Sequence, residues 1–281
     1  MKIHEWLKQA EDQLETVGIA TARLDALVLL EDVTGIGRAR LLAEPDMELS
    51  AAQTAKLEKL LKQRAQHEPL AYIRGRTEFY GREFVITPDV MEPRPESETM
   101  IDVFKDLAKD GLLDQKEPGN ELPLRIADVG TGSGALGITA ALEASNASVD
   151  LLGIDPKALT VAKTNVDKFT LNVSVIKSNL LGRSAKDYDI LLCNLPYVPD
   201  DYPINQAATR EPRIAIFGGP DGLDVYRKLF KQVSKFPRRP LYILTESLPP
   251  QHESLQGIAQ RHGYQLQQSD DFIQVFILSK I

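Results

Sequence analysis

The stretch that decides the fold lies at residues 124–137 and reads LRIADVGTGSGALG. A short apolar run leads into a glycine-rich loop, and a segment with helical periodicity follows at residues 135–144. Glycine has no Cβ, so a loop rich in glycine can turn sharply and let a ligand approach its backbone. A strand, a glycine-rich turn and a helix in this order predict the first unit of a nucleotide-binding α/β domain.

The alternation of strand and helix continues after this loop. Strands are expected at 125–129, 150–154, 173–177, 188–193 and 241–245, and helices at 135–144, 157–169 and 223–234. This order predicts an open, mostly parallel sheet with helices on both faces. Two further strands at 264–268 and 272–278 predict an antiparallel hairpin that closes a seven-stranded sheet.

The first 75 residues have a different pattern. Apolar residues recur there at helical spacing, without strand-like alternation, in three segments: residues 6–17, 24–30 and 55–61. We therefore expect a small helical-bundle domain over residues 1–75. A second domain, residues 76–281, is expected to begin with a hairpin that turns at Gly81, followed by a proline-rich connector and a helix at 97–113.

Composition narrows the functional classes. The chain has 281 residues, a single cysteine, and a net charge of −7 from 33 basic and 40 acidic residues. One cysteine excludes an intramolecular disulfide, and the four histidines have no metal-ligand spacing, so we expect no metal site. No membrane-spanning apolar run and no signal-peptide pattern are present, which predicts a cytoplasmic protein. The acidic balance makes a nucleic-acid partner an unfavoured expectation.

Two acidic residues, one before the glycine-rich loop and one at the end of the next strand, indicate a cofactor. Asp155 ends the second strand, where a carboxylate can accept hydrogen bonds from both hydroxyls of a ribose. Residues 132–137 satisfy the G-x-G-x-x-G fingerprint, so a nicotinamide enzyme is one alternative. Asp128 favours S-adenosylmethionine instead, because a carboxylate before the glycines suits a ligand ammonium better than a pyrophosphate. The competing interpretation is that Asp128 only binds the loop backbone.

The tetrapeptide Asn194-Leu195-Pro196-Tyr197 follows the fourth strand and predicts the catalytic site. The Asn194 side-chain oxygen and the Leu195 carbonyl can accept the two N–H bonds of a planar NH2 group, while Pro196 stiffens the turn and Tyr197 can stack on the acceptor. Holding the nitrogen in line with a methyl donor needs no strong base, since orientation supplies about 7–11 kcal/mol in well-aligned cases. In isolation the same four residues are also typical of a simple turn.

Several motifs together resemble one known family. The segments read RLDALVLL at 23–30, EPLAYIRG at 68–75, FYG at 79–81 and PRPESE at 93–98. They are similar to the HemK/PrmC family of peptide chain release factor N5-glutamine methyltransferases, over nearly the whole chain. The resemblance implies a helical substrate-recognition domain, a hairpin linker and a Rossmann-like class I S-adenosylmethionine-dependent methyltransferase domain. It implies as acceptor the glutamine of the Gly-Gly-Gln motif in class 1 release factors.

The resemblance also extends the expected site. The expected cofactor-binding residues are Asp128, Gly130, Thr131, Gly132, Ser133, Gly134, Asp155, Asn179, Leu180 and Asn194. The expected substrate-binding residues are Arg94, Pro95, Glu98, Asn194 and Tyr197. An ion pair between Arg94 and Glu98 is the competing interpretation of those two charges. A monomer with a release factor as its protein substrate is expected.

The chain departs from the family pattern at three places, and they keep other substrates open. Leu195 replaces the first proline of Asn-Pro-Pro-Tyr, which makes the tetrapeptide similar to that of ribosomal RNA adenine N6-dimethyltransferases. Asn179 stands where the family usually has aspartate, and Ser247 stands where it has glycine. The closing stretch at 269–274 lacks the family's glycine and arginine. The alternatives are an adenine N6-methyltransferase on RNA or DNA, a divergent paralogue with another protein target, and a cofactor-binding module without activity.

Overall fold

The computed structural model describes residues 1–109, 123–144, 146–182 and 187–279. The chain divides into two compact units. One unit comprises Met1–Gly75 with Asn205–Arg210, and the other comprises Arg76–Ile204 with Glu211–Ile281.

The amino-terminal unit is a bundle of short helices. Their bounds are α1 Ile3–Thr16, α2 Ala22–Thr34, α3 Arg38–Ala43, α4 Ala51–Ala65 and α5 Leu70–Arg74. Trp6 and Leu57 are buried in its core, as the helical spacing predicted. The buried carboxylate of Asp25 on α2 accepts a 2.6 Å hydrogen bond from Arg64 on α4 and so connects two helices across the bundle.

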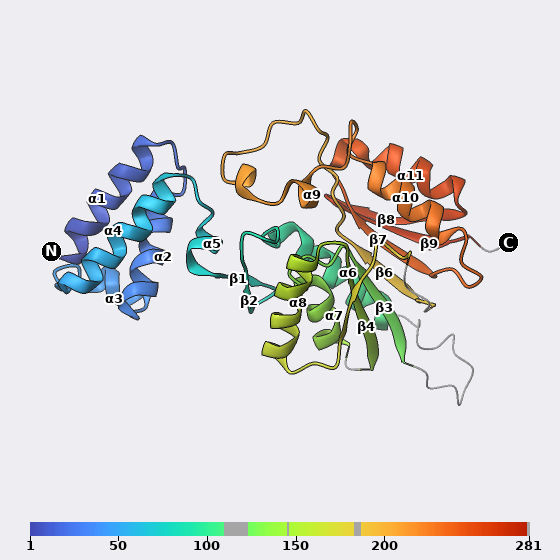
Figure 1. Cartoon of the computed structure of the whole chain (residues 1–281), viewed down its shortest axis with the longest axis horizontal. Helices are drawn as coiled ribbons and strands as arrows, with labels where there is room; N and C mark the ends of the chain where they lie inside the picture. The colour runs from blue at the N-terminus through green and yellow to red at the C-terminus, as the bar shows by residue number, and fades with distance from the viewer. Residues whose placement is uncertain (110–122, 145, 183–186, 280–281) are drawn as a thin grey trace. The chain divides into compact units, whose positions relative to one another are not determined.

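The second unit contains a two-stranded hairpin and a seven-stranded sheet (Figure 1). The hairpin consists of β1 Arg76–Phe79 and β2 Arg82–Val85, and the sheet of β3 Leu124–Val129, β4 Ala147–Gly153, β5 Ser174–Lys177, β6 Ile190–Cys193, β7 Tyr242–Glu246, β8 Tyr264–Asp270 and β9 Ile273–Leu278. The helices of this unit are α6 Glu98–Lys109, α7 Ala135–Glu143, α8 Pro156–Phe169, α9 Arg213–Ile216, α10 Asp224–Val233 and α11 His252–Arg261.

The sheet order is β5-β4-β3-β6-β7-β9-β8. The pairs from β5 to β7 are parallel, and β9 runs antiparallel to both β7 and β8. The prediction of a mostly parallel sheet with a closing antiparallel hairpin is therefore confirmed. Chain order runs outward from β3 in one direction and from β6 in the other, so the β3–β6 boundary is the switch point where α/β sheets bind ligands.

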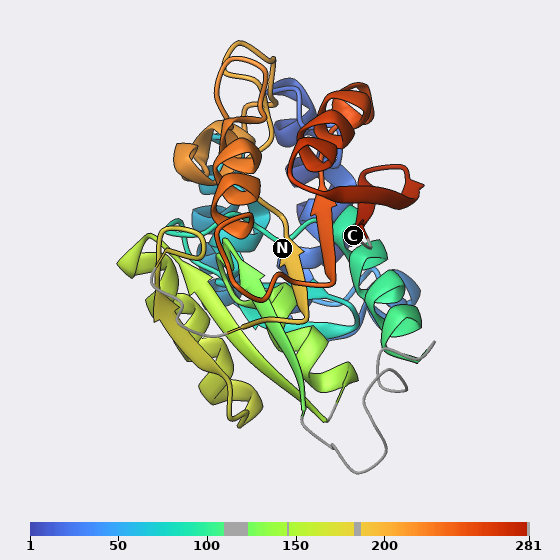
Figure 2. The ribbon, with the colours of Figure 1, turned by 90° about the vertical axis from the view of Figure 1, so that its right-hand side faces the viewer.

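Each face of the sheet has its own hydrophobic core, because successive residues of a strand point to opposite faces. Ile126 of β3 and Leu192 of β6 pack in one core, together with apolar residues of α6, α7 and α8. Ala127 and Leu191, their neighbours in the chain, pack in the other with α10 and α11. The two helix layers lie on opposite sides of the sheet (Figure 1, Figure 2).

The helices differ from the predicted elements in several places, and the short helices α3, α5 and α9 were not predicted. The helix α11 was not predicted, although Leu255, Ile258 and Ala259 form its short buried stripe. Gln256 and Gly257 separate Leu255 from Ile258, and three apolar residues are too few to reveal a helical period in the sequence. The helix predicted at 97–113 begins at Glu98 and is described to Lys109, and the rest of that prediction lies outside the described residues.

Candidate active site

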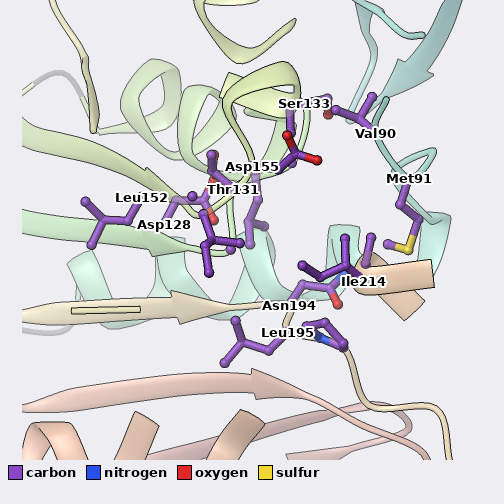
Figure 3. A pocket seen from close by; sticks show the side chains of 18 of the residues that line it. Val90, Met91, Asp128, Thr131, Ser133, Leu152, Asp155, Asn194, Leu195 and Ile214 are labelled. Carbon is purple, nitrogen blue, oxygen red and sulfur yellow. The ribbon is translucent and has the colours of Figure 1, made fainter. Parts of the chain in front are cut away.

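A cavity of about 430 Å³ lies where β3, β4 and β6 end (Figure 3). Its size is in the range of small-molecule sites, roughly 300–1,000 Å³. Many of the residues singled out from the sequence line it: Asp128, Gly130, Thr131, Gly132, Ser133, Asp155, Asn179, Leu180, Asn194, Leu195 and Pro196. The topology brings these segments together because parallel strands present their carboxyl ends at one edge of the sheet.

The glycine-rich loop has a backbone that other residues adopt only with strain. Gly130, Gly132 and Gly134 all have positive φ, at 83°, 54° and 84°. A Cβ on Gly130 would lie 2.8 Å from Cδ2 of Leu195. The loop between β3 and α7 therefore needs glycine both for its conformation and for close contact with the tetrapeptide after β6.

Asp128 at the end of β3 is 1% exposed and holds the loop in shape. Its Oδ2 accepts hydrogen bonds from the Thr131 hydroxyl at 2.6 Å and from the Gly137 amide at 3.0 Å. Burial raises the pKa of Asp128 to about 6, while these two bonds act to lower it. The competing interpretation, that Asp128 binds the loop, therefore describes contacts that the structure contains. Both bonds end on Oδ2, and Asp128 also lines the cavity.

Asp155 and the segment at residues 179–180 belong to other parts of the cavity wall. Asp155 is the N-cap of α8, where its Oδ1 accepts a bond from the Lys157 amide at 2.9 Å. Its carboxylate faces the cavity in Figure 3. Leu180 is buried with a φ of 54°, and Asn179 before it is exposed. A carboxylate beside an apolar surface suits a ribose attached to a flat base.

The backbone of the tetrapeptide after β6 is held by a second glycine-containing loop. Gln251 donates from Nε2 to the carbonyl of Tyr197 at 2.7 Å and to that of Asp221 at 2.8 Å. A Cβ on Gly222 would lie 2.0 Å from the Tyr197 carbonyl oxygen, and one on Gly218 would lie 2.4 Å from that of Pro196. Only glycine permits this close approach at both positions.

The side chains of the tetrapeptide meet a buried carboxylate at the end of β7. Glu246 is fully buried, and its Oε1 accepts a hydrogen bond from the Tyr197 hydroxyl at 3.0 Å. Its Oε2 accepts one from the Ser97 hydroxyl at 2.6 Å, and Ser97 in turn accepts one from Nδ2 of Asn194 at 2.8 Å. Burial raises the pKa of Glu246, and the bonds from Ser97, Tyr197 and Asn194 each act to lower it.

A buried tyrosine joins the ends of β6 and β7. The Tyr226 hydroxyl lies 2.9 Å from the Cys193 carbonyl and 2.6 Å from the Glu246 carbonyl, and the amides of Leu195 and Glu246 donate to it at 3.4 and 3.2 Å. The Leu195 bond depends on an N–H that proline lacks. Leu195 itself is 2% exposed and packs in the core beneath the loop.

Five of the residues expected at the site do not line the cavity: Arg94, Pro95, Glu98, Gly134 and Tyr197. Arg94 forms an ion pair of 2.5 Å with the buried Glu211. Glu98 accepts a hydrogen bond from the Tyr80 amide at the hairpin turn. The alternative of an Arg94–Glu98 ion pair was therefore wrong, because each charge has a different partner.

Sequence reasoning missed several residues that shape this site: Ser97, Gly222, Tyr226, Glu246 and Gln251. The sequence offered a signal for two of them, because Ser97 lies in the PRPESE motif at 93–98 and Glu246 directly precedes Ser247, where the chain departs from the family pattern. The others lie between 25 and 54 residues from the tetrapeptide residues that they contact. Only the fold brings them to the tetrapeptide.

Comparison with solved structures defines the class of the fold. The chain superposes on the catalytic domain of hMettl16, solved in complex with the MAT2A 3′UTR hairpin 1, with a TM-score of 0.57, 15% identity and 91% coverage of both chains. It superposes on a T. thermophilus 16S rRNA methyltransferase, solved with AdoMet and guanosine, with a TM-score of 0.50, 16% identity, and coverage of 73% of this chain and 50% of the other. The fold is the Rossmann-like fold of class I methyltransferases.

Comparison by sequence identifies the family. Residues 5–75 match the PrmC N-terminal domain, and residues 112–210 match the methyltransferase small domain. A release factor glutamine methyltransferase of Coxiella burnetii is 33% identical over 94% of this chain and 92% of its own length. One from Koribacter versatilis is 35% identical over 81% of each. The chain belongs to the release factor glutamine methyltransferase family.

A longer relative has a similar region. The chain is 32% identical to a bifunctional methyltransferase of Rickettsia felis, over 94% of this chain and 55% of that protein. Among the described residues, no helix is long and apolar enough to cross a membrane.

Proposed function

We propose that this protein transfers a methyl group from S-adenosylmethionine to the side-chain amide N5 of the glutamine in the Gly-Gly-Gln motif of class 1 peptide chain release factors. The observation that carries the proposal is the Asn194 amide at the cavity, with its nitrogen engaged by Ser97 and its oxygen therefore directed elsewhere. The names of the family relatives support the substrate.

The residues around the cavity fit S-adenosylmethionine. Oδ1 of Asp128 would receive its ammonium, the backbone of the loop at 130–134 would surround its methionyl part, and the Asp155 carboxylate would accept bonds from its ribose hydroxyls. Leu180 and Asn179 would contact its adenine. The positive φ of Gly130, Gly132 and Gly134 supports this fit, because it folds the loop so that Gly130, Thr131, Gly132 and Ser133 line the cavity. When bound, the cofactor supplies an activated methyl group on a sulfonium.

The tetrapeptide would prepare the acceptor nitrogen. A primary amide is a poor nucleophile because its nitrogen lone pair is delocalised into the carbonyl. Asn194 Oδ1 and the Leu195 carbonyl would accept the two N–H bonds and steer the nitrogen toward tetrahedral geometry. Pro196 would fix the turn, and the Tyr197 ring, held by Glu246, would limit the acceptor's position. Arg94, Pro95 and Glu98 stay predicted substrate contacts.

The test is transfer of labelled methyl from S-adenosylmethionine to an intact class 1 release factor, with mass spectrometry of the Gly-Gly-Gln peptide. We expect one added methyl on the glutamine. Asn194→Ala should abolish transfer, whereas Asn172→Ala, which removes an exposed amide, should not. Cofactor binding without any transfer to the factor would contradict the proposal.

Leu195 gives a specific reason to include RNA in the same assay. Asn-Leu-Pro-Tyr is similar to the motif of adenine N6-dimethyltransferases, and hMettl16, solved with an RNA hairpin, shares the fold. The net charge of −7 opposes this alternative, since RNA binding usually involves a cationic surface. Methyl incorporation into ribosomal RNA in place of protein would establish it.

The proposal includes a cytoplasmic monomer whose helical unit, residues 1–75, recognises the body of the release factor. Leu24 and Leu42 are large apolar side chains of this unit that are 47% and 49% exposed. Leu24→Asp and Leu42→Asp should raise KM for the intact factor and leave methylation of a short Gly-Gly-Gln peptide unchanged. Equal effects on both substrates would argue against a recognition role.

A further inference from the structure

The Asn194 amide has two ends with opposite chemistry, and only one orientation suits an NH2 acceptor. Its oxygen accepts hydrogen bonds, whereas its nitrogen only donates them. An acceptor NH2 group brings donors to the site, so Oδ1 must face the cavity. If the amide were rotated by 180°, its two N–H donors would face the N–H donors of the acceptor. Binding would then be repulsive and the acceptor nitrogen misplaced.

The polar chain behind Asn194 has a direction set by its last member. An ionised carboxylate can only accept hydrogen bonds. Both carboxylate oxygens of Glu246 act as acceptors: Oε1 accepts from the Tyr197 hydroxyl, and Oε2 accepts the single proton of the Ser97 hydroxyl at 2.6 Å. The Ser97 oxygen then has only lone pairs left, and the atom that faces it at 2.8 Å must be a donor, Nδ2 of Asn194. Asn194 Oδ1 is consequently directed away from Ser97.

The three residues are held on separate elements, so the chain is a product of the tertiary fold. Ser97 ends a 3₁₀ turn before α6 and is 3% exposed, Glu246 ends β7, and Asn194 follows β6. Tyr226 fixes the backbone of Glu246 through both its carbonyl and its amide. The Tyr197 hydroxyl occupies the other carboxylate oxygen. Glu246 thus has little freedom to change its partners.

We propose that Ser97 and Glu246 are positioning residues that orient the Asn194 amide, with its oxygen toward the methyl acceptor, through a one-way chain of hydrogen bonds from Asn194 to Ser97 to Glu246. The inference rests on the proposed function, because it assumes an NH2 acceptor at this site. It assigns a specific task to a buried carboxylate that does not line the cavity.

The test compares Ser97→Thr with Ser97→Val, two side chains of the same shape that differ by a hydroxyl. Ser97→Thr retains the hydroxyl and should keep kcat near the wild-type value. Ser97→Val removes the relay and should lower kcat by about 10- to 100-fold, as expected for a misoriented catalytic group. The Kd for S-adenosylmethionine and the KM for the release factor should change little. Thr139→Val is the control, since it removes a buried hydroxyl that has no partner in the structure.

The double variant distinguishes a relay from general loss of packing. Glu246→Gln should also lower kcat, and Ser97→Val combined with Glu246→Gln should be no slower than the slower single variant, because both break one chain. Multiplied effects, or equal kcat for Ser97→Val and Ser97→Thr, would overturn the inference. If the wild-type enzyme does not methylate the factor at all, the proposed function fails. If the wild-type enzyme methylates the factor and Ser97→Val has the same kcat as the wild type, only the relay is rejected.

Discussion

Gly222→Ala is the substitution whose effect the structure determines most directly. Gly222 has a φ of 79°, and its missing Cβ would lie 2.0 Å from the carbonyl oxygen of Tyr197 and 2.4 Å from Nε2 of Gln251. Real Cβ contacts are not shorter than 3.0 Å, so the Tyr197 carbonyl must retreat by the difference between 2.0 and 3.0 Å. The alanine would therefore displace the backbone of the predicted catalytic tetrapeptide, residues 194–197.

The magnitude follows from that displacement. A shift of about 1 Å in a catalytic group costs about 100-fold in rate, so kcat should fall by about that factor. The left-handed conformation costs alanine roughly 1–2 kcal/mol. Loss of the Gln251–Tyr197 bond removes another ~1 kcal/mol. The free energy of unfolding should decrease by about 2–3 kcal/mol, and the cofactor Kd should change little because the loop at 130–134 is not displaced.

The assay combines methyl transfer to the release factor, cofactor calorimetry and thermal unfolding. Gly257→Ala is the matched control: Gly257 lies inside α11, and the nearest atom to its added Cβ is Arg261 Nη1 at 3.7 Å. Alanine there should preserve kcat and raise stability by up to ~1 kcal/mol through its helix propensity. A Gly222→Ala enzyme with wild-type kcat would show that the contact with Tyr197 does not position the loop.

Three further predictions follow from the charged residues. Asp128→Asn should weaken cofactor binding yet stabilise the free protein above pH 6. The pKa of Asp128 is about 6 in the folded protein and 3.8 in an unfolded chain. The carboxyl therefore contributes to stability below pH 4, and up to ~3 kcal/mol of that contribution is lost as pH rises through 6. Unfolding measured at pH 5 and pH 8 checks the sign, and an asparagine variant less stable than wild type at pH 8 would refute it. Asp155→Ala should raise the cofactor Kd, measured by calorimetry, with little change in kcat at saturating cofactor; an unchanged Kd with a lowered kcat would contradict this. Loss of the N-cap of α8 should also lower the free energy of unfolding in denaturant by ~1 kcal/mol. Arg94→Met should destabilise the protein by about 1–3 kcal/mol because it leaves the buried Glu211 without its ion-pair partner. Adding Glu211→Gln should restore most of this loss in the same unfolding assay. Unchanged stability of Arg94→Met would indicate that Arg94 acts mainly on substrate.

The sequence predicted well those features that local patterns encode. The glycine loop at 130–134, the strands on either side of it and the tetrapeptide after β6 all have short-range signals, because glycine, proline and apolar periodicity act within a few residues. The helix α11 was missed because its buried stripe consists of only three apolar residues, Leu255, Ile258 and Ala259. The partners of Arg94 and Glu98 were missed because nothing local connects Arg94 to Glu211.

The sequence by itself determined the fold class, the glycine-rich loop and the turn after β6 that carries the predicted catalytic tetrapeptide, since each is encoded in contiguous residues with their own conformational preferences. The tertiary structure alone decided how Asn194 is oriented. That orientation depends on Ser97 and Glu246, which lie 97 and 52 positions away in the chain and meet Asn194 only where β6 and β7 end side by side. Hydrogen-bond direction is a property of atoms in contact, and contacts over such separations form only when the sheet is assembled.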